Sequence, residues 1–203
     1  TCLFANDFDP KKAESYKANW GGAGLRVEDV AMLSTFDLPD EADMAWASFP
    51  CQDLSLAGNG AGLKGSRSGT FWPFWKLIKS LKSEGRQPKI VVLENVCGLL
   101  TSHGGDDFRL LCQQVSNSGY RFGAITVDAA HFVPQSRPRL FVIGVREDLT
   151  FEGADYPTTD WHSARLIEAT RALSEPLKMR WIWFRLPSPP LRNHRLADLL
   201  EPD

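Results

Sequence analysis

The sequence predicts an α/β protein built around a doubly wound, mostly parallel sheet. Short apolar runs alternate along the chain with segments whose apolar residues recur at helical spacing. Polar residues follow several of the apolar runs, at the carboxyl ends of strands, where such sheets bind ligands. The 203 residues suffice for one domain with a substantial hydrophobic core, or for one domain with an appendage.

Five apolar runs predict strands. The first two cover residues 2–5 and 43–49. The uninterrupted run at 89–93 is typical of a central parallel strand that is covered on both faces. The runs at 124–127 and 140–145 are close enough in sequence to form an antiparallel pair. We therefore expect a mostly parallel sheet with an antiparallel strand near one edge.

Three segments predict helices, over residues 10–20, 70–83 and 108–115. The first begins with a proline, which is favoured in the first helical turn. The apolar residues of the second are spaced to form one buried face: they are Phe71, Phe74, Trp75, Leu77, Ile78 and Leu81. The glycines between residues 56 and 69 predict a loop that can move. After residue 150 the periodicity weakens, and residues 181–190 are typical of an extended, proline-stiffened connection.

The net charge of −2 is an average over segments of opposite sign. A near-neutral chain argues mildly against a nucleic-acid partner, because proteins that bind phosphate backbones usually carry a basic surplus. Residues 1–50 hold 4 basic and 9 acidic side chains, whereas residues 51–100 hold 7 basic and 3 acidic ones. The total charge therefore does not exclude nucleic acid as a partner of the second segment.

The four cysteines lie far apart, without a CxxC pair or a cluster of histidines. This spacing disfavours a zinc site or a disulfide framework, and it favours a reducing, intracellular compartment. No apolar run reaches the roughly 18 residues that a membrane-spanning helix needs. We therefore expect neither a metal nor a membrane as a partner.

Two candidate catalytic residues follow predicted strands. Cys51 stands where the strand at 43–49 gives way to the glycine-rich loop, so it can be an accessible nucleophile. A lone cysteine is, however, more often a small buried hydrophobic residue. Glu94 ends the strand at 89–93, where desolvation would favour its protonated form and let it donate a proton near neutral pH. A glutamate that caps a helix or pairs with an arginine is an equally good interpretation.

A third polar group, at residues 135–139, opens the strand at 140–145. Side chains two residues apart in a strand point to the same side, so Arg137 and Arg139 would act together. Two guanidinium groups can hold a phosphate, a carbonyl oxygen or a carboxylate. Taken alone, the pair could also protect an exposed sheet edge. A nucleophile, a proton donor and an anion clamp on one rim together favour attack on an electron-poor ring.

Several sequence blocks resemble those of the cytosine-carbon-5 DNA methyltransferases. Three blocks are similar to the signature blocks of that family, in the right order and at about the right spacing: FPCQDLS, LENV and QSRPRLFVIGVR. SRSGTFWPFW resembles the block that opens the helix beside the cofactor, and FANDFDPKKAESYKANW resembles the second block. The resemblance covers about residues 3–148 and implies a Rossmann-like methyltransferase fold that uses S-adenosylmethionine.

The resemblance also implies a division of the chain. Residues 1–150 would form the catalytic and cofactor-binding domain, and residues 151–203 a connection towards a target-recognition region. The family's first block, its target-recognition region and its last two blocks are not among the 203 residues. We therefore expect a catalytic-core fragment with weak activity of its own.

The same resemblance assigns catalytic roles. The thiolate of Cys51 would add to carbon 6 of a cytosine flipped out of the duplex. Glu94 would hold the ring nitrogen and the exocyclic amine, while Arg139 would contact the base carbonyl and Arg137 a backbone phosphate. The remaining members of the catalytic set are Asn95 and Gln52.

Cofactor and DNA contacts are implied in the same way. Asp7 would bind the ribose hydroxyls, Phe8 would stack on the adenine, and Asp29 would accept a hydrogen bond from the adenine amine. Without the resemblance, Asp7 and Asp29 would be interpreted as solvated turn residues. The other expected cofactor contacts are Val30, Pro50, Thr70 and Phe71, and the expected DNA contacts are Ser55, Lys64, Arg67 and Gln135.

These implications describe a monomeric enzyme that methylates double-stranded DNA in the bacterial cytoplasm, where it associates with the nucleoid. Two alternatives remain open. One is a tRNA methyltransferase of the same family, although FPCQDLSLAG is more similar to the DNA-modifying branch. The other is a catalytically inert regulatory relative, against which the presence of Cys51, Glu94 and Arg139 argues.

Overall fold

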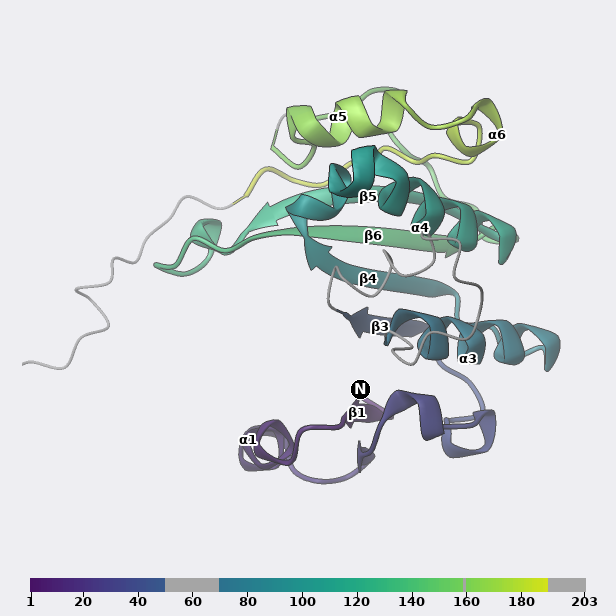
Figure 1. Cartoon of the computed structure of the whole chain (residues 1–203), viewed down its shortest axis with the longest axis vertical. Helices are drawn as coiled ribbons and strands as arrows, with labels where there is room; N and C mark the ends of the chain where they lie inside the picture. Colours follow the sequence, from purple (N-terminus) through teal and green to yellow (C-terminus); the bar gives the residue numbers. More distant parts are fainter. Residues whose placement is uncertain (50–69, 159, 190–203) are drawn as a thin grey trace, which may run out of the picture. The chain divides into compact units, whose positions relative to one another are not determined.

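The computed structural model describes residues 1–49, 70–158 and 160–189, and the chain divides into two compact units between Ile90 and Val91 (Figure 1). The first unit opens with the short strand β1 (Ala5–Asp7), which pairs in parallel with β2 (Leu25–Val27). Helix α1 (Pro10–Trp20) connects the two strands. It starts where Asp9 accepts a hydrogen bond from the backbone N–H of Lys11 at 2.9 Å, with proline as its first residue.

The described part of this unit also contains strand β3 (Met44–Ser48) and helix α3 (Phe71–Ser83). The helix buries the face that the sequence predicts, except that Phe74 is only half-buried. Phe71 packs between the rings of Phe49 and Trp75, at centroid distances of 5.1 and 5.6 Å. Each large side chain buried in this way stabilises the fold by about 1.5–3 kcal/mol.

Arg86 ties the end of α3 to the preceding loop. Its guanidinium donates hydrogen bonds to four backbone carbonyls, those of Thr35, Leu38, Pro39 and Asp40. It also pairs with Glu84 at 2.6 Å, and Glu84 accepts a second hydrogen bond from the hydroxyl of Thr35. The loop that leads from β2 towards β3 is therefore fixed by one cation.

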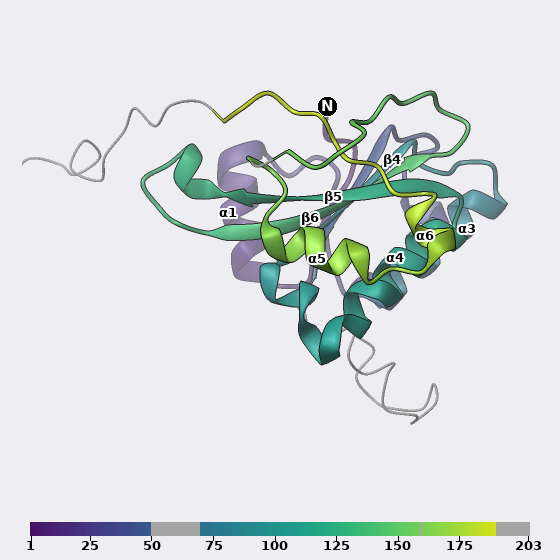
Figure 2. The ribbon, with the colours of Figure 1, turned by 90° about the horizontal axis from the view of Figure 1, so that it is seen from above.

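The second unit holds a sheet in which β6 (Pro138–Arg146) lies between β4 (Ile90–Val96) and β5 (Tyr120–Asp128). β5 and β6 pair antiparallel from Tyr120↔Arg146 to Asp128↔Pro138, which confirms the predicted antiparallel pair. Three helices lie beside β5 in both views (Figures 1 and 2): α4 (Asp106–Asn117), α5 (Ala164–Arg171) and α6 (Glu175–Lys178). The core includes the apolar centre of β4 and one face of α4.

The segment after residue 150 packs into this unit. Ile182 donates its backbone N–H to the carbonyl of Phe122, and Phe122 donates to the carbonyl of Arg180, so the chain runs alongside β5. Ile182 and Phe184 are buried together with Trp161. This close approach requires glycine at position 123, where a Cβ atom would lie 1.9 Å from the carbonyl oxygen of Ile182.

The structure corrects the predicted ends of several elements. The predicted strand at 2–5 is instead β1, because the ladder with β2 starts where Ala5 donates to the carbonyl of Gly24. The predicted strand at 124–127 is the much longer β5, and the predicted helix at 108–115 extends by two residues at each end. The sequence pattern did not predict β2, α5 or α6. Within the described part of the chain, no helix has the length and apolar character needed to cross a membrane.

Candidate active site

Glu94 and Arg139 come together on neighbouring strands of the second unit. Glu94 is the fifth residue of β4, and Arg139 is the second residue of β6. The Nε atom of Arg139 lies 3.5 Å from Oε1 of Glu94, with 21% of the arginine side chain and 25% of the glutamate side chain exposed. The two groups that the sequence places at strand ends therefore form an ion pair that a ligand can still reach from solvent.

Arg137 differs from Arg139 in position. β6 begins at Pro138, so Arg137 lies just before the strand, and the argument from strand alternation applies to Arg139 alone. Arg137 is exposed, and its backbone N–H donates to Asp128 at 2.7 Å. Arg139 is half-buried and donates to the carbonyl of Pro138 at 2.8 Å. Arg137 thus presents a cation at the surface, whereas Arg139 is held beside Glu94.

Asn95 and Cys97 surround the end of β4. Asn95 is buried, and its side-chain oxygen accepts a hydrogen bond from the N–H of Val96 at 2.8 Å, which fixes the exit of the strand. Burial raises the pKa of the Cys97 thiol, although the charges of Arg139 and Arg165 act to lower it. A thiol with a raised pKa is a poor nucleophile at neutral pH, so Cys97 does not fit the role that the sequence predicts for Cys51.

Asp128, which the sequence did not single out, organises the connection between β5 and β6. Its carboxylate accepts hydrogen bonds from the backbone of Ala130 at 3.0 Å, from the backbone of Arg137 at 2.7 Å and from the hydroxyl of Ser136 at 2.9 Å. These hydrogen bonds hold the pKa of Asp128 below its ordinary value, and the bond from Ala130 has the largest effect. The carboxylate thereby fixes the loop that carries Gln135, a side chain exposed to solvent.

The predicted cofactor residues Asp7 and Asp29 lie at the carboxyl ends of the parallel pair β1 and β2. Asp7 accepts the backbone N–H of Asp9 at 2.9 Å, and Lys12 lies 3.7 Å from its other oxygen. Asp29 accepts the N–H of Ala31 at 2.9 Å and caps the helical turn that begins at Val30. Both carboxylates thus have the backbone contacts of turn residues, at the edge where parallel sheets bind nucleotides.

The aromatic and hydroxyl members of the cofactor set differ in exposure. Phe8 is exposed, so its ring is open to a planar partner. Thr70 precedes α3 and is half-buried. Phe71 is fully buried in the core of the first unit, which favours a packing role, and its contact with a cofactor stays a prediction. The remaining predicted residues lie outside the described residues: Pro50, Cys51, Gln52, Ser55, Lys64 and Arg67.

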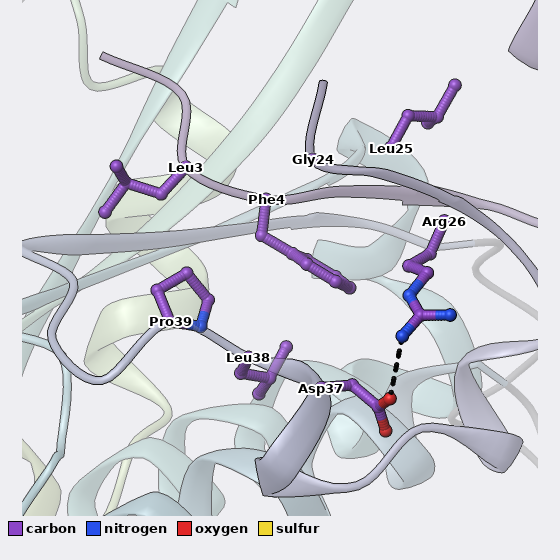
Figure 3. Close-up of a pocket in the computed structure, with 8 residues that line it drawn as sticks. All are labelled: Leu3, Phe4, Gly24, Leu25, Arg26, Asp37, Leu38 and Pro39. Atoms are coloured by element: carbon purple, nitrogen blue, oxygen red, sulfur yellow. Dashed lines mark hydrogen bonds and ion pairs between the residues drawn. The ribbon is translucent and has the colours of Figure 1, made fainter. Parts of the chain in front are cut away.

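A pocket of about 410 Å³ lies at the other end of the β1–β2 pair (Figure 3). Leu3 and Phe4 precede β1, Leu38 and Pro39 face them, and the ion pair between Arg26 and Asp37 at 3.2 Å lies beside them. Among the predicted cofactor residues that the structure describes, none lines this pocket. It is therefore distinct from the edge that carries Asp7 and Asp29. Over residues 1–49, 70–158 and 160–189, no three His, Cys, Asp or Glu side chains gather so as to hold a metal ion.

Comparison with known proteins supports one family. The sequence model of the C-5 cytosine-specific DNA methylases matches residues 1–200. Type II methyltransferase M.BsuFI of Bacillus subtilis is 32% identical over 157 residues, covering 77% of this chain and 36% of that protein. Type II methyltransferase M.NgoFVII of Neisseria gonorrhoeae is 33% identical over 153 residues, covering 74% of this chain and 39% of that protein. The chain thus spans less than half the length of these relatives.

Solved structures share the fold. The Dnmt2 methyltransferase of S. pombe matches 76% of this chain and 45% of its own, with a TM-score of 0.57 and 23% identity. A DNMT2 mutant of Spodoptera frugiperda matches 100% of this chain and 53% of its own, with a TM-score of 0.67 and 19% identity. These likenesses confirm the methyltransferase type of α/β fold that the sequence predicts.

Proposed function

Since the chain belongs to the C-5 cytosine-specific DNA methylase family, we propose that it forms the catalytic core of an enzyme that methylates carbon 5 of cytosine in double-stranded DNA. The observation that carries this proposal is the pairing of Glu94 with Arg139 on adjacent strands, at 3.5 Å. A carboxyl and a guanidinium side by side match the polar edge of cytosine, which offers a ring nitrogen and an amine next to a carbonyl oxygen.

In the proposed reaction, the Cys51 thiolate forms a bond to carbon 6 of the flipped cytosine. Glu94 gives a proton to the ring nitrogen as the adduct forms, which leaves carbon 5 electron-rich enough to attack a methyl group. Arg139 holds the carbonyl oxygen of the base and stabilises the charge that develops there. Removal of the carbon-5 proton and expulsion of Cys51 then restore the aromatic ring and release the methylated base.

The proposed cofactor is S-adenosylmethionine, which supplies an electrophilic methyl group when bound. The first unit fits its nucleoside part, because Asp7 ends β1, Asp29 follows the end of the parallel neighbour β2, and the ring of Phe8 is exposed. Asp7 would accept the ribose hydroxyls and Asp29 the adenine amine, while the ring of Phe8 stacks on adenine. DNA phosphates would be bound by Ser55, Lys64, Arg67 and Arg137.

The proposal extends to the setting of the enzyme. We place catalysis and cofactor binding in residues 1–150 and assign residues 151–203 to the passage towards target recognition. We place the protein in the bacterial cytoplasm, as a monomer that associates with the nucleoid through DNA. Sedimentation of the protein alone tests whether it is a monomer, and sedimentation with duplex DNA tests whether it binds that partner.

Covalent trapping tests the function. An oligonucleotide that carries 5-fluorocytosine blocks the loss of the substituent at carbon 5, so the adduct with Cys51 accumulates and survives denaturation. We expect capture on duplex DNA by the natural protein that carries this chain, and none by its Cys51→Ser variant. Glu94→Gln should slow capture strongly, whereas Glu152→Gln, at an exposed position, should not.

The outcomes separate the candidate functions. Capture on DNA supports the proposal, and capture on tRNA alone supports the RNA methyltransferase. Absence of capture on either nucleic acid by the natural protein supports the inert relative.

A further inference from the structure

The connection between β5 and β6 exposes apolar side chains at its tip. Phe132 is 50% exposed and Val133 is 45% exposed, and in Figure 1 this connection projects beyond the end of β4. The ring of Phe132 contacts the ring of its neighbour His131 edge-on, at a centroid distance of 6.4 Å. Phe132 and Val133 are neighbours in the chain, so together they offer apolar surface that a partner can cover.

The backbone under this tip is well ordered by hydrogen bonds. Phe132 and Val133 both donate their N–H groups to the carbonyl of Ala129, at 2.8 and 2.9 Å. Asp128 clamps both ends of the connection through Ala130, Ser136 and Arg137. The ring is thus presented on a preorganised loop, so a partner that binds it would lose little free energy in ordering the loop.

The charges around the tip favour a polyanion as that partner. Arg137 is exposed at the base of the loop, and Arg139 follows two residues later. The acidic residue of the loop, Asp128, is engaged by three donors from the loop itself. An exposed ring on the same loop as an exposed arginine, here Arg137, is a combination that proteins use to bind unstacked nucleic acid.

We propose that Phe132 is a positioning residue for the DNA substrate, whose ring stacks on a base next to the flipped cytosine while Val133 packs against the neighbouring sugar. This inference rests on the proposed function. Apolar wedges stabilise distorted DNA by filling the space between unstacked bases. Phe132 would thereby hold the duplex open while Arg137 binds the phosphate.

The test uses the natural protein that carries this chain and a duplex with 2-aminopurine beside the target cytosine, because this base fluoresces when it is unstacked. Phe132→Ala should weaken duplex binding at least fivefold, the lower end of what one stacked aromatic contributes, and should reduce the fluorescence increase. Phe132→Tyr keeps a stacking ring and should retain both. Phe36→Ala removes a ring that is 98% exposed elsewhere and should leave both unchanged.

Two results would overturn the inference. One is binding and fluorescence by Phe132→Ala equal to those of the unsubstituted protein. The other is a drop in melting temperature for Phe132→Ala that Phe36→Ala does not show, because the ring would then cover another part of the protein. If the unsubstituted protein neither binds nor methylates duplex DNA, the proposed function itself fails. That outcome is distinguished from failure of the inference about Phe132, because it is seen without any substitution.

Discussion

Replacing Arg86 by alanine should destabilise the first unit more than any loss of a surface ion pair. The Arg86 side chain is 22% exposed, and its guanidinium donates to four backbone carbonyls and pairs with Glu84 at 2.6 Å. Hydrogen bonds that involve a charged group contribute about 1.5–3 kcal/mol each when buried, but these share one side chain and are partly hydrated. We therefore expect a total loss of about 3 kcal/mol, less than the sum of the separate bonds.

Thermal unfolding followed by circular dichroism measures this loss. For a chain of this size, about 3 kcal/mol corresponds to a decrease of about 6–12 °C in melting temperature. Arg109→Ala is the matched control, because Arg109 pairs with Asp106 one helical turn away on an exposed surface, and such pairs contribute only about 0.3–0.5 kcal/mol. A decrease for Arg86→Ala no larger than that for Arg109→Ala would refute the assignment of Arg86 as the tie between α3 and the loop.

Three further predictions follow from single features. Gly123→Ala should cost about 3 kcal/mol in the free energy of unfolding, since its Cβ would meet the carbonyl of Ile182; Gly98→Ala, whose nearest neighbour is at 3.8 Å, should cost much less in the same urea titration. Because the pKa of Asp128 is lowered in the folded protein, its charged carboxylate stabilises the fold at every pH above its ordinary pKa near 4. This stabilisation is lost as the pH falls through the lowered pKa. Between pH 6 and pH 3, the melting temperature should therefore fall less for Asp128→Asn than for the unsubstituted protein. For the control Asp155→Asn it should fall as much as for the unsubstituted protein. Residues 1–203 alone should transfer tritiated methyl groups to DNA poorly, and robust turnover by this stretch would contradict the interpretation as a partial catalytic core.

The parts of the fold with strong periodicity could be predicted from the sequence. The apolar spacing in 70–83 corresponds to the buried face of α3, and the unbroken run at 89–93 is the buried centre of β4. The antiparallel pairing of β5 and β6 followed from their closeness in sequence. For α3 and β4 the pattern predicts burial, on one face of the helix and on both faces of the strand.

Elements whose stability comes from distant contacts could not be predicted. β2 has three residues and exists because its backbone pairs with β1. α5 and α6 lie beyond residue 150, and the chain around them is held by Trp161, Ile182 and Phe184. No local pattern carries such contacts, since they depend on chain segments that meet only in the folded state.

The residues of the candidate site also divide into those that could be predicted from the sequence and those that could not. Glu94 and Arg139 could be predicted because each stands next to a strong strand, and the structure brings them within 3.5 Å. Arg137 could not be placed, because the strand starts one residue later than the alternation argument requires. Asp128 carries no motif of its own, and its role depends on the three loop donors that surround its carboxylate.

In the proposed mechanism Cys51 forms a covalent bond to cytosine with the help of Glu94 and Arg139. Peptide mass spectrometry of the product trapped on duplex DNA containing 5-fluorocytosine identifies the residue that carries the base. We expect a single peptide with the methylated fluorocytosine nucleotide on Cys51, and strongly reduced trapping in Glu94→Gln and Arg139→Leu. A nucleotide attached to Cys97, or trapping that persists in Cys51→Ser, would contradict it.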